Sequence, residues 1–114
     1  MTGEFKSLKQ ALQSEPFVIT AEIPPPVSAG PFELEAKIAL LKGSVHAINL
    51  TDNAGAVAHM SSLAGSAIVL SRGIDPIFQI TCRDRNRLAI QSDLMGASAL
   101  GINNILRVGG DPIK

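Results

Sequence analysis

Four polar segments of this 114-residue chain could do chemistry, because each ends or follows a short apolar run and they recur at fairly regular spacing. Between them they supply carboxylates for proton transfer, amides for hydrogen bonding and a glycine pair that a flat ligand could approach closely. The segments are Glu22-Ile23-Pro24-Pro25-Pro26, Asn49-Leu50-Thr51-Asp52-Asn53, Gln79-Ile80-Thr81-Cys82-Arg83-Asp84 and Arg107-Val108-Gly109-Gly110-Asp111.

Glu22 is the candidate acid. It stands between Ala21 and Ile23 and ahead of three prolines, so few local donors would stabilise its charge. Desolvation there would favour the protonated form, which could deliver a proton near neutral pH. The alternative is a solvated glutamate in a turn, and the usual exposure of Glu favours that reading for the residue taken alone.

Asp111 follows Gly109-Gly110 and precedes Pro112. The two glycines would let the backbone approach a bulky ligand, but the segment also fits an ordinary Gly-Asp-Pro turn. The chain has neither a GxGxxG after its first strand nor a Walker loop, so the standard nucleotide-binding fingerprints are absent. A joint site requires that Glu22 and Asp111 face one cavity.

The run Arg83-Asp84-Arg85-Asn86-Arg87 places three cations near the start of a predicted helix, where the helix dipole disfavours them. An anion or a carboxylate nearby, such as Asp52 or Asp111, would explain them. A solvated charge run is the interpretation that we favour from sequence.

Alternating strands and helices would position these residues. We expect Phe32, Ala36 and Leu40 to face the core on one helix, and Leu88 and Met95 to do so on another. The glycines that should end the three crossover helices are Gly43, Gly73 and Gly101. Periodicity predicts a lead-in helix at 4–14, strands at 17–23, 45–51, 76–82 and 103–108, and crossover helices from about 31, 57 and 86.

This order predicts one α/β domain over residues 1–114, with a parallel sheet whose polar strand ends share one rim. Serial right-handed crossovers build either an open doubly wound sheet or part of a (β/α)8 TIM barrel, and a whole barrel needs roughly 250 residues. Half a barrel would expose an apolar inner face and two unpaired strand edges. It should therefore form a homo-oligomer or bind a partner subunit that supplies the rest of the barrel.

Composition excludes several classes of partner. Ten basic and ten acidic residues give a formal charge of zero, so no nucleic acid or anionic membrane is expected as partner. The single cysteine allows no internal disulfide and no zinc-type ligand spacing, so no metal site is expected. With no signal-peptide pattern and no long apolar span, we expect a cytoplasmic protein.

Taken in order, the polar segments resemble the N-terminal half of the methylenetetrahydrofolate reductase family, flavin enzymes built on a (β/α)8 barrel. The resemblance covers residues 17–112. Thr81-Cys82-Arg83-Asp84-Arg85-Asn86-Arg87 resembles the branch found in many anaerobes and archaea, some members of which work with a partner subunit. The family patterns matched are Glu-x-x-Pro-Pro by residues 22–26, the second strand tip by 48–53, His/Gln-x-Thr-Cys by 79–82 and Leu-Arg-Gly-Asp-Pro by 107–112.

The resemblance implies FAD-dependent reduction of 5,10-methylenetetrahydrofolate to 5-methyltetrahydrofolate, a step of one-carbon metabolism and methionine biosynthesis. Glu22 would be the general acid that assists opening of the folate's five-membered ring, and reduced flavin would supply hydride. Glu22 and Asp111 would contact the folate. The electron donor stays open between NADH, NADPH and reduced ferredoxin. The implied FAD contacts are Thr51, Asp52, Gln79, Val108, Gly109, Gly110 and Asp111.

Two residues depart from the family pattern. Gln79 stands where better-known bacterial members have His, and Gly109 where many have Arg; either change could weaken flavin binding or alter the electron donor. The later strands that complete the flavin and folate sites are also missing from this chain. Two other hypotheses stay open: a catalytically inactive, flavin-free half-barrel subunit, and an open flavodoxin-like binding domain.

Overall fold

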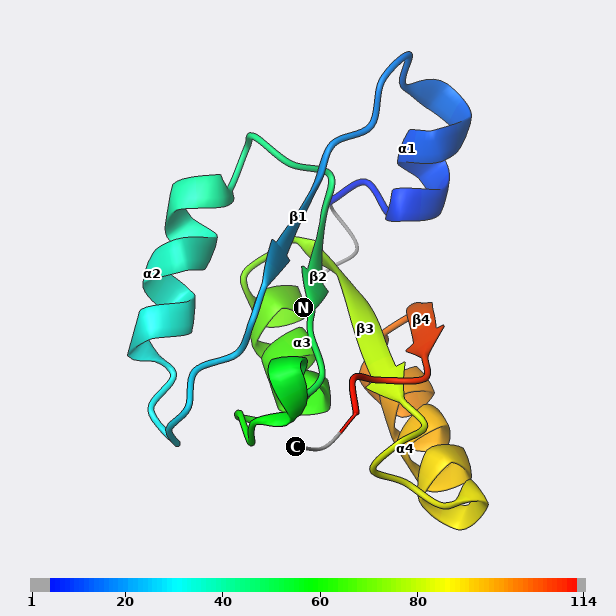
Figure 1. Cartoon of the computed structure of the whole chain (residues 1–114). Coiled ribbons are helices and arrows are strands. Elements are labelled where there is room, and N and C mark those ends of the chain that lie inside the picture. The colour runs from blue at the N-terminus through cyan, green and yellow to red at the C-terminus, as the bar shows by residue number, and fades with distance from the viewer. Residues whose placement is uncertain (1–4, 113–114) are drawn as a thin grey trace.

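The structure, a computed structural model, describes residues 5–112 and contains one sheet of four parallel strands (Figure 1). Helices alternate with the strands, so the predicted parallel α/β fold is confirmed. The strands are β1 (Thr20–Ile23), β2 (Ala47–Leu50), β3 (Asp75–Thr81) and β4 (Asn104–Val108). The helices are α1 (Leu8–Ser14), α2 (Phe32–Leu41), α3 (Ser62–Ser71) and α4 (Arg87–Leu100), with a short 3-10 turn η1 (Ala54–Ala56).

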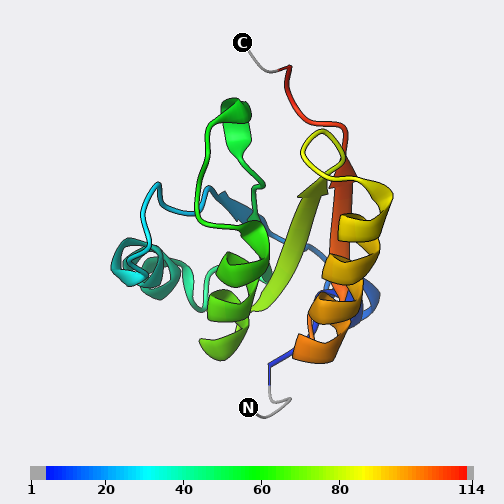
Figure 2. The ribbon, with the colours of Figure 1, turned by 90° about the horizontal axis from the view of Figure 1, so that it is seen from below.

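The strands lie in the sheet in the order of the chain, β1-β2-β3-β4. Because each right-handed crossover moves the chain in the same direction, α2, α3 and α4 line up along one face of the sheet (Figure 2). A flavodoxin-like sheet reverses its strand order and carries helices on both faces. The described residues show no such reversal, so the flavodoxin-like hypothesis is wrong and the arrangement is that of a partial parallel barrel.

The hydrophobic core lies between the sheet and these three helices. Ile48 and Leu50 of β2 pack with Leu34 of α2 and Val69 of α3, and all four are at most 1% exposed. Phe78 of β3 packs in a second cluster with Ala97 of α4. Each buried side chain of this size stabilises the fold by roughly 1.5–3 kcal/mol, so one face of every crossover is fixed against the sheet.

The other face of the sheet, here called the lumen face, carries polar side chains. Glu22 pairs in register with Asn49, and Asn49 with Ile77, which itself pairs with Asn104. Side chains alternate along a strand, so these residues point away from the helix-covered side. The expectation of an apolar inner face was therefore wrong, because amides and a carboxylate interrupt the apolar residues there.

The stripes predicted to face the core on two helices face outward instead. Phe32 and Leu40 of α2 are 78% and 82% exposed, whereas Leu34 and Ile38 are buried. On α4, Leu88 and Met95 are exposed as well. Each helix has two stripes at helical spacing, and periodicity does not say which one meets the sheet. These outward stripes leave exposed apolar surface on α2 and α4, the first and last of the three helices that cover the sheet.

Helix α1 closes the end of the sheet opposite the polar strand tips, at the top of Figure 1. It begins at Leu8 rather than residue 4, which lies outside the described residues, because Ser7 forms a capping box with Gln10. The Leu8 N–H donates to Oδ2 of buried Asp75 at 2.7 Å, at the start of β3. This bond anchors α1 to the sheet.

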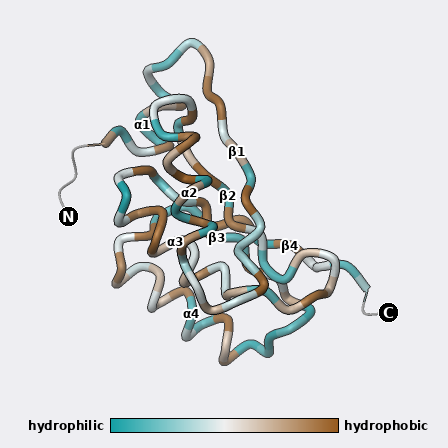
Figure 3. Tube along the Cα trace, turned by 90° about the vertical axis from the view of Figure 1, so that its left-hand side faces the viewer, coloured by the Kyte–Doolittle hydropathy of each residue, from teal (hydrophilic) through white to brown (hydrophobic). Residues whose placement is uncertain are grey.

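The remaining differences lie at element boundaries. Helix α3 begins at Ser62, because Ser61 caps it by accepting from the Ala64 N–H; the predicted start at residue 57 falls in a loop. The hydrophobic stretch that leads into β1 (Figure 3) is largely exposed, with Phe17 72% accessible, so β1 pairs only from Thr20. Gly43, Gly73 and Gly101 do follow or end their helices and have φ of 84–89°, as predicted.

Candidate active site

A polar cavity of about 330 Å³ lies at the carboxyl ends of the strands, opposite α1. All of the residues predicted to form a site line it, except Gly109. It also includes four residues that sequence reasoning did not select as site residues, although three of them belong to the polar segments themselves. The full lining is Glu22, Thr51, Asp52, Asn53, Ala54, Gln79, Thr81, Arg83, Val108, Gly110 and Asp111.

Glu22 reaches this cavity from the first strand of the sheet, and Asp111 from the segment that follows the last strand. Asn49 Nδ2 donates to Glu22 Oε1 at 3.3 Å, and the Gly55 N–H donates to Asp111 Oδ2 at 3.3 Å. The spatial requirement for a joint site is thereby met. Glu22 is exposed, however, so the desolvation expected from its neighbours along the sequence is not provided by the described residues.

Asp52 braces the ends of β2 and β3. Its side chain is completely buried and forms an ion pair with Arg85. The backbone N–H and the hydroxyl of Thr81 donate to its Oδ2 at 2.8 Å and 3.0 Å. The Asp52 N–H donates in turn to Gln79 Oε1 at 3.1 Å. The Asp52 carboxylate is thus occupied by protein donors, and it acts on the cavity by fixing Thr81.

Two of the three arginines in the run are not solvated, contrary to the interpretation favoured from sequence, and only Arg87 is exposed. The side chains of Arg83 and Arg85 are only 12% and 14% exposed. Arg83 donates to the Asp111 carbonyl at 2.8 Å and to the Asn53 carbonyl at 3.3 Å. Its hydrogen bonds to Asp84 raise the pKa of Arg83 against the opposing effect of burial. Arg83 therefore ties together the tips of β2, β3 and β4.

Gly110 belongs to this contact. Its φ is +91°, and an added Cβ would lie 3.1 Å from Arg83 Cβ, so a side chain at this position would meet both backbone strain and a clash. A Cβ at Gly109 would have no atom within 4 Å. Close packing on Arg83 therefore explains Gly110 without a ligand, while the space beside Gly109 is open.

Asp84 should make stability depend on pH in the acid range. The hydrogen bond from Arg83 lowers the pKa of Asp84 from 3.8 to about 2, opposed by burial and aided by Asn53 and Thr81. A carboxyl pKa that is lower in the folded state stabilises that state above the unfolded value, and the benefit is lost as pH falls from about 4 toward 2. We expect Asp84→Asn to cost about 1 kcal/mol or less at pH 7, because the side chain is partly exposed. The cost should be clearly smaller at pH 2, where about half of the folded-state carboxyl groups are protonated, and should vanish only below that pH.

Urea unfolding of both proteins at the two pH values checks this expectation. Glu33→Gln, which alters the exposed Glu33–Lys37 pair, is the control and should change stability little at either pH. An equal effect of Asp84→Asn at pH 7 and pH 2 would contradict the assigned role of the carboxylate.

Two buried polar atoms beside the cavity have no partner among the described residues. They are Thr51 Oγ1, in a residue that is 6% exposed, and Asn49 Oδ1. Buried polar atoms are nearly always hydrogen bonded, to protein, water or a ligand. These two atoms therefore mark positions at the lumen face where a partner from outside the described residues is expected.

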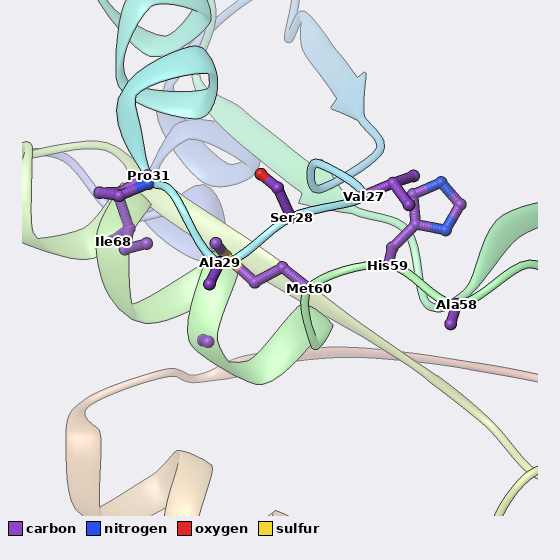
Figure 4. A pocket seen from close by; sticks show the side chains of 9 residues that line it. Val27, Ser28, Ala29, Pro31, Ala58, His59, Met60 and Ile68 are labelled. Atoms are coloured by element: carbon purple, nitrogen blue, oxygen red, sulfur yellow. The ribbon is translucent and has the colours of Figure 1, made fainter.

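A second hollow, of about 690 Å³, lies between the loop after β1 and the start of α3 (Figure 4). Residues of the loop after β1 and of the loop before α3 line it. A hydrogen bond from the Met60 N–H to the Pro26 carbonyl, 2.8 Å long, holds these two loops together. The surface of this hollow is largely apolar and contains none of the predicted site residues, so the polar chemistry is concentrated in the first cavity. The lining is Val27, Ser28, Ala29, Pro31, Ala58, His59, Met60, Ala64 and Ile68.

No helix within residues 5–112 is long and apolar enough to cross a membrane. Over the same residues, no group of three or more His, Cys, Asp or Glu side chains could hold a metal ion.

Parallel strands in chain order, helices on one face and a polar cavity at the carboxyl ends define part of an α/β barrel with a ligand site in the usual position. The family model described as methylenetetrahydrofolate reductase matches residues 7–114. The chain belongs to this family of oxidoreductases. A comparison with curated proteins gave no match.

Proposed function

We propose that this chain provides the proton-donating side of an enzyme that reduces 5,10-methylenetetrahydrofolate to 5-methyltetrahydrofolate with FAD. The observation that carries the proposal is that Glu22 and Asp111 line one polar cavity, in a chain matched by this family over nearly its whole length. Glu22 gives its proton to one nitrogen of the folate's five-membered ring, the nitrogen whose bond to the methylene carbon breaks when the ring opens. Asp111 binds the folate from the opposite side.

The residues present fit a flavin. Thr51 offers a buried hydroxyl without a partner among the described residues, and the space beside Gly109 is open. A cavity of about 330 Å³ is at the small end of ligand sites, so it suits one ring system rather than a whole dinucleotide. When bound, FAD would supply hydride. The residues that would hold it are Thr51, Gln79, Val108, Gly109, Gly110 and Asp111, with Asp52 bracing Thr81.

Further strands are needed to enclose this site, and we propose that they pair with β1 and β4, the two edges of the sheet. Apolar side chains on the edge strand β4, Ile105 and Leu106, are exposed and would be covered by the added elements. Enclosure would also desolvate Glu22. The rest of the same protein, a second copy or a partner subunit could supply these strands, and we place the assembly in the cytoplasm.

Thr51→Val tests the flavin site. The substitution keeps the shape of the side chain and removes the hydroxyl, so we expect about 3- to 10-fold weaker FAD binding, the equivalent of one hydrogen bond. Stability should be unchanged or higher, because an unpartnered buried hydroxyl is lost. Quenching of flavin fluorescence during titration measures the affinity, and urea unfolding measures the stability.

Ser66→Ala is the matched control, since Ser66 Oγ is also buried without a partner among the described residues but lies on α3 outside the cavity. It should leave FAD affinity unchanged. Equal affinity of Thr51→Val and wild type would remove Thr51 from the flavin site. If the chain binds no FAD at saturating concentration, the alternative is supported: a flavin-free, catalytically inactive half-barrel subunit, which the exposure of Glu22 favours.

A further inference from the structure

Asn49 lies directly beside Glu22, and our sequence analysis gave it no role. The two residues pair in register between β1 and β2, with both side chains on the lumen face. Asn49 Nδ2 donates to Glu22 Oε1 at 3.3 Å. The other end of the amide, Oδ1, is buried and has no partner among the described residues. The amide therefore has one end on the candidate acid and the other facing a group that the described residues do not supply.

The donor end of the amide restricts the proton on Glu22. A protonated carboxyl group carries one O–H, and that hydrogen cannot face the N–H of an amide. The carbonyl oxygen is the stronger acceptor of the two, so with Asn49 Nδ2 at Oε1 the proton is favoured on Oε2. The amide also limits rotation of the carboxyl group, which would otherwise be free because Glu22 is exposed.

The acceptor end explains why the amide keeps this orientation. A buried acceptor left unpaired is costly, so Oδ1 requires a donor. Turning the amide over would place Oδ1 against the ionised Glu22 carboxylate, and two acceptors cannot bond each other. Any donor to Oδ1 from outside the described residues would therefore keep Nδ2 on Glu22.

We propose that Asn49 is a positioning residue: it holds the Glu22 carboxyl group with Oε2 as the proton-bearing oxygen. This inference rests on the proposed function, in which Glu22 is the acid. Asn49 itself does not exchange a proton with the folate.

The contact can be tested without catalysis. In protein labelled with 13C at the glutamate carboxyl carbon, the Glu22 signal is identified by its absence in Glu22→Gln. We expect Asn49→Leu to move this signal at pH 8, because the carboxylate loses its donor. Asn104→Leu is the control, since Asn104 is also on the lumen face but donates to Asp75 at the far end of the sheet. A Glu22 signal unmoved by Asn49→Leu overturns the proposal.

Catalysis gives the second measurement, on the flavin-loaded enzyme that includes the strands completing the barrel. Asn49→Leu should lower kcat about 10- to 100-fold with KM within about 3-fold, as misplacement of a reacting group does, and should change the pH profile of kcat. Asn104→Leu should lower stability but leave kcat and the profile unchanged. Equal losses of kcat in both variants, or an unchanged kcat in Asn49→Leu, overturn the positioning role. If the wild-type enzyme does not reduce the folate, the proposed function fails, while the carboxyl signal still decides whether Asn49 holds Glu22.

Discussion

Glu22→Gln is expected to lower the rate of methylenetetrahydrofolate reduction by about 10²- to 10⁴-fold, the usual contribution of a general acid. Glutamine has nearly the same shape and can still bond Asn49, so binding geometry is retained while the transferable proton is lost. Because Glu22 is exposed in this chain, the substitution should not disturb folding. FAD affinity should stay within about twofold, since the flavin contacts lie on other strands.

Single-turnover reduction by the flavin-loaded enzyme measures this effect directly, because it separates the folate step from reduction of the flavin by its electron donor. Glu33→Gln, on the outer surface of α2, is the matched control and should retain full activity. Undiminished reduction by Glu22→Gln would remove Glu22 from the acid role. Loss of flavin together with activity would assign it to cofactor binding instead.

The position of the site could be predicted from sequence because it depends on topology. Once strands alternate with helices, all carboxyl ends fall on one rim, and residues as far apart as Glu22 and Asp111 must meet there. Local signals also predicted the C-terminal ends of the helices, since Gly73 and Gly101 have the left-handed backbone that stops a helix. These conclusions needed only short-range chemistry and the handedness of the crossovers.

Pairings between segments could not be predicted in the same way. The arginine run gave no sign of which of its members would be buried. Burial of Arg85 depends on its pairing with Asp52, which lies 33 positions earlier in the chain. The helix faces failed for a related reason: α2 has both a Leu34–Ile38 stripe and a Phe32–Leu40 stripe, and only the assembled sheet selects between them. The buried atoms of Asn49 and Thr51 likewise become visible only in three dimensions.

Because the Asp52–Arg85 pair is largely buried, breaking it should have the largest effect on the stability of the fold. Asp52→Leu is expected to lower the free energy of unfolding by about 3 kcal/mol, the low end of the cost of breaking a buried ion pair. Arg85 would keep only the partly exposed Asp93 carboxylate, 3.1 Å from its Nε. The substitution also leaves the Thr81 N–H and hydroxyl without their acceptor. Since a domain of this size has about 5–15 kcal/mol in total, the loss is a large fraction of its stability.

A double-mutant cycle measured by urea unfolding separates the pair from its surroundings. If the cost of Asp52→Leu comes from the cation left with Asp93 as its remaining carboxylate partner, adding Arg85→Met should recover about half of it or more, since a buried ion pair is often replaceable by apolar side chains. Arg72→Met, which breaks the more exposed Arg72–Glu35 pair, should cost less than about 1 kcal/mol. If the two substitutions at Asp52 and Arg85 are simply additive, the carboxylate serves Thr81 alone. Weaker FAD binding by the double variant would then link the brace at the end of β3 to the shape of the cavity, since Thr81 lines it.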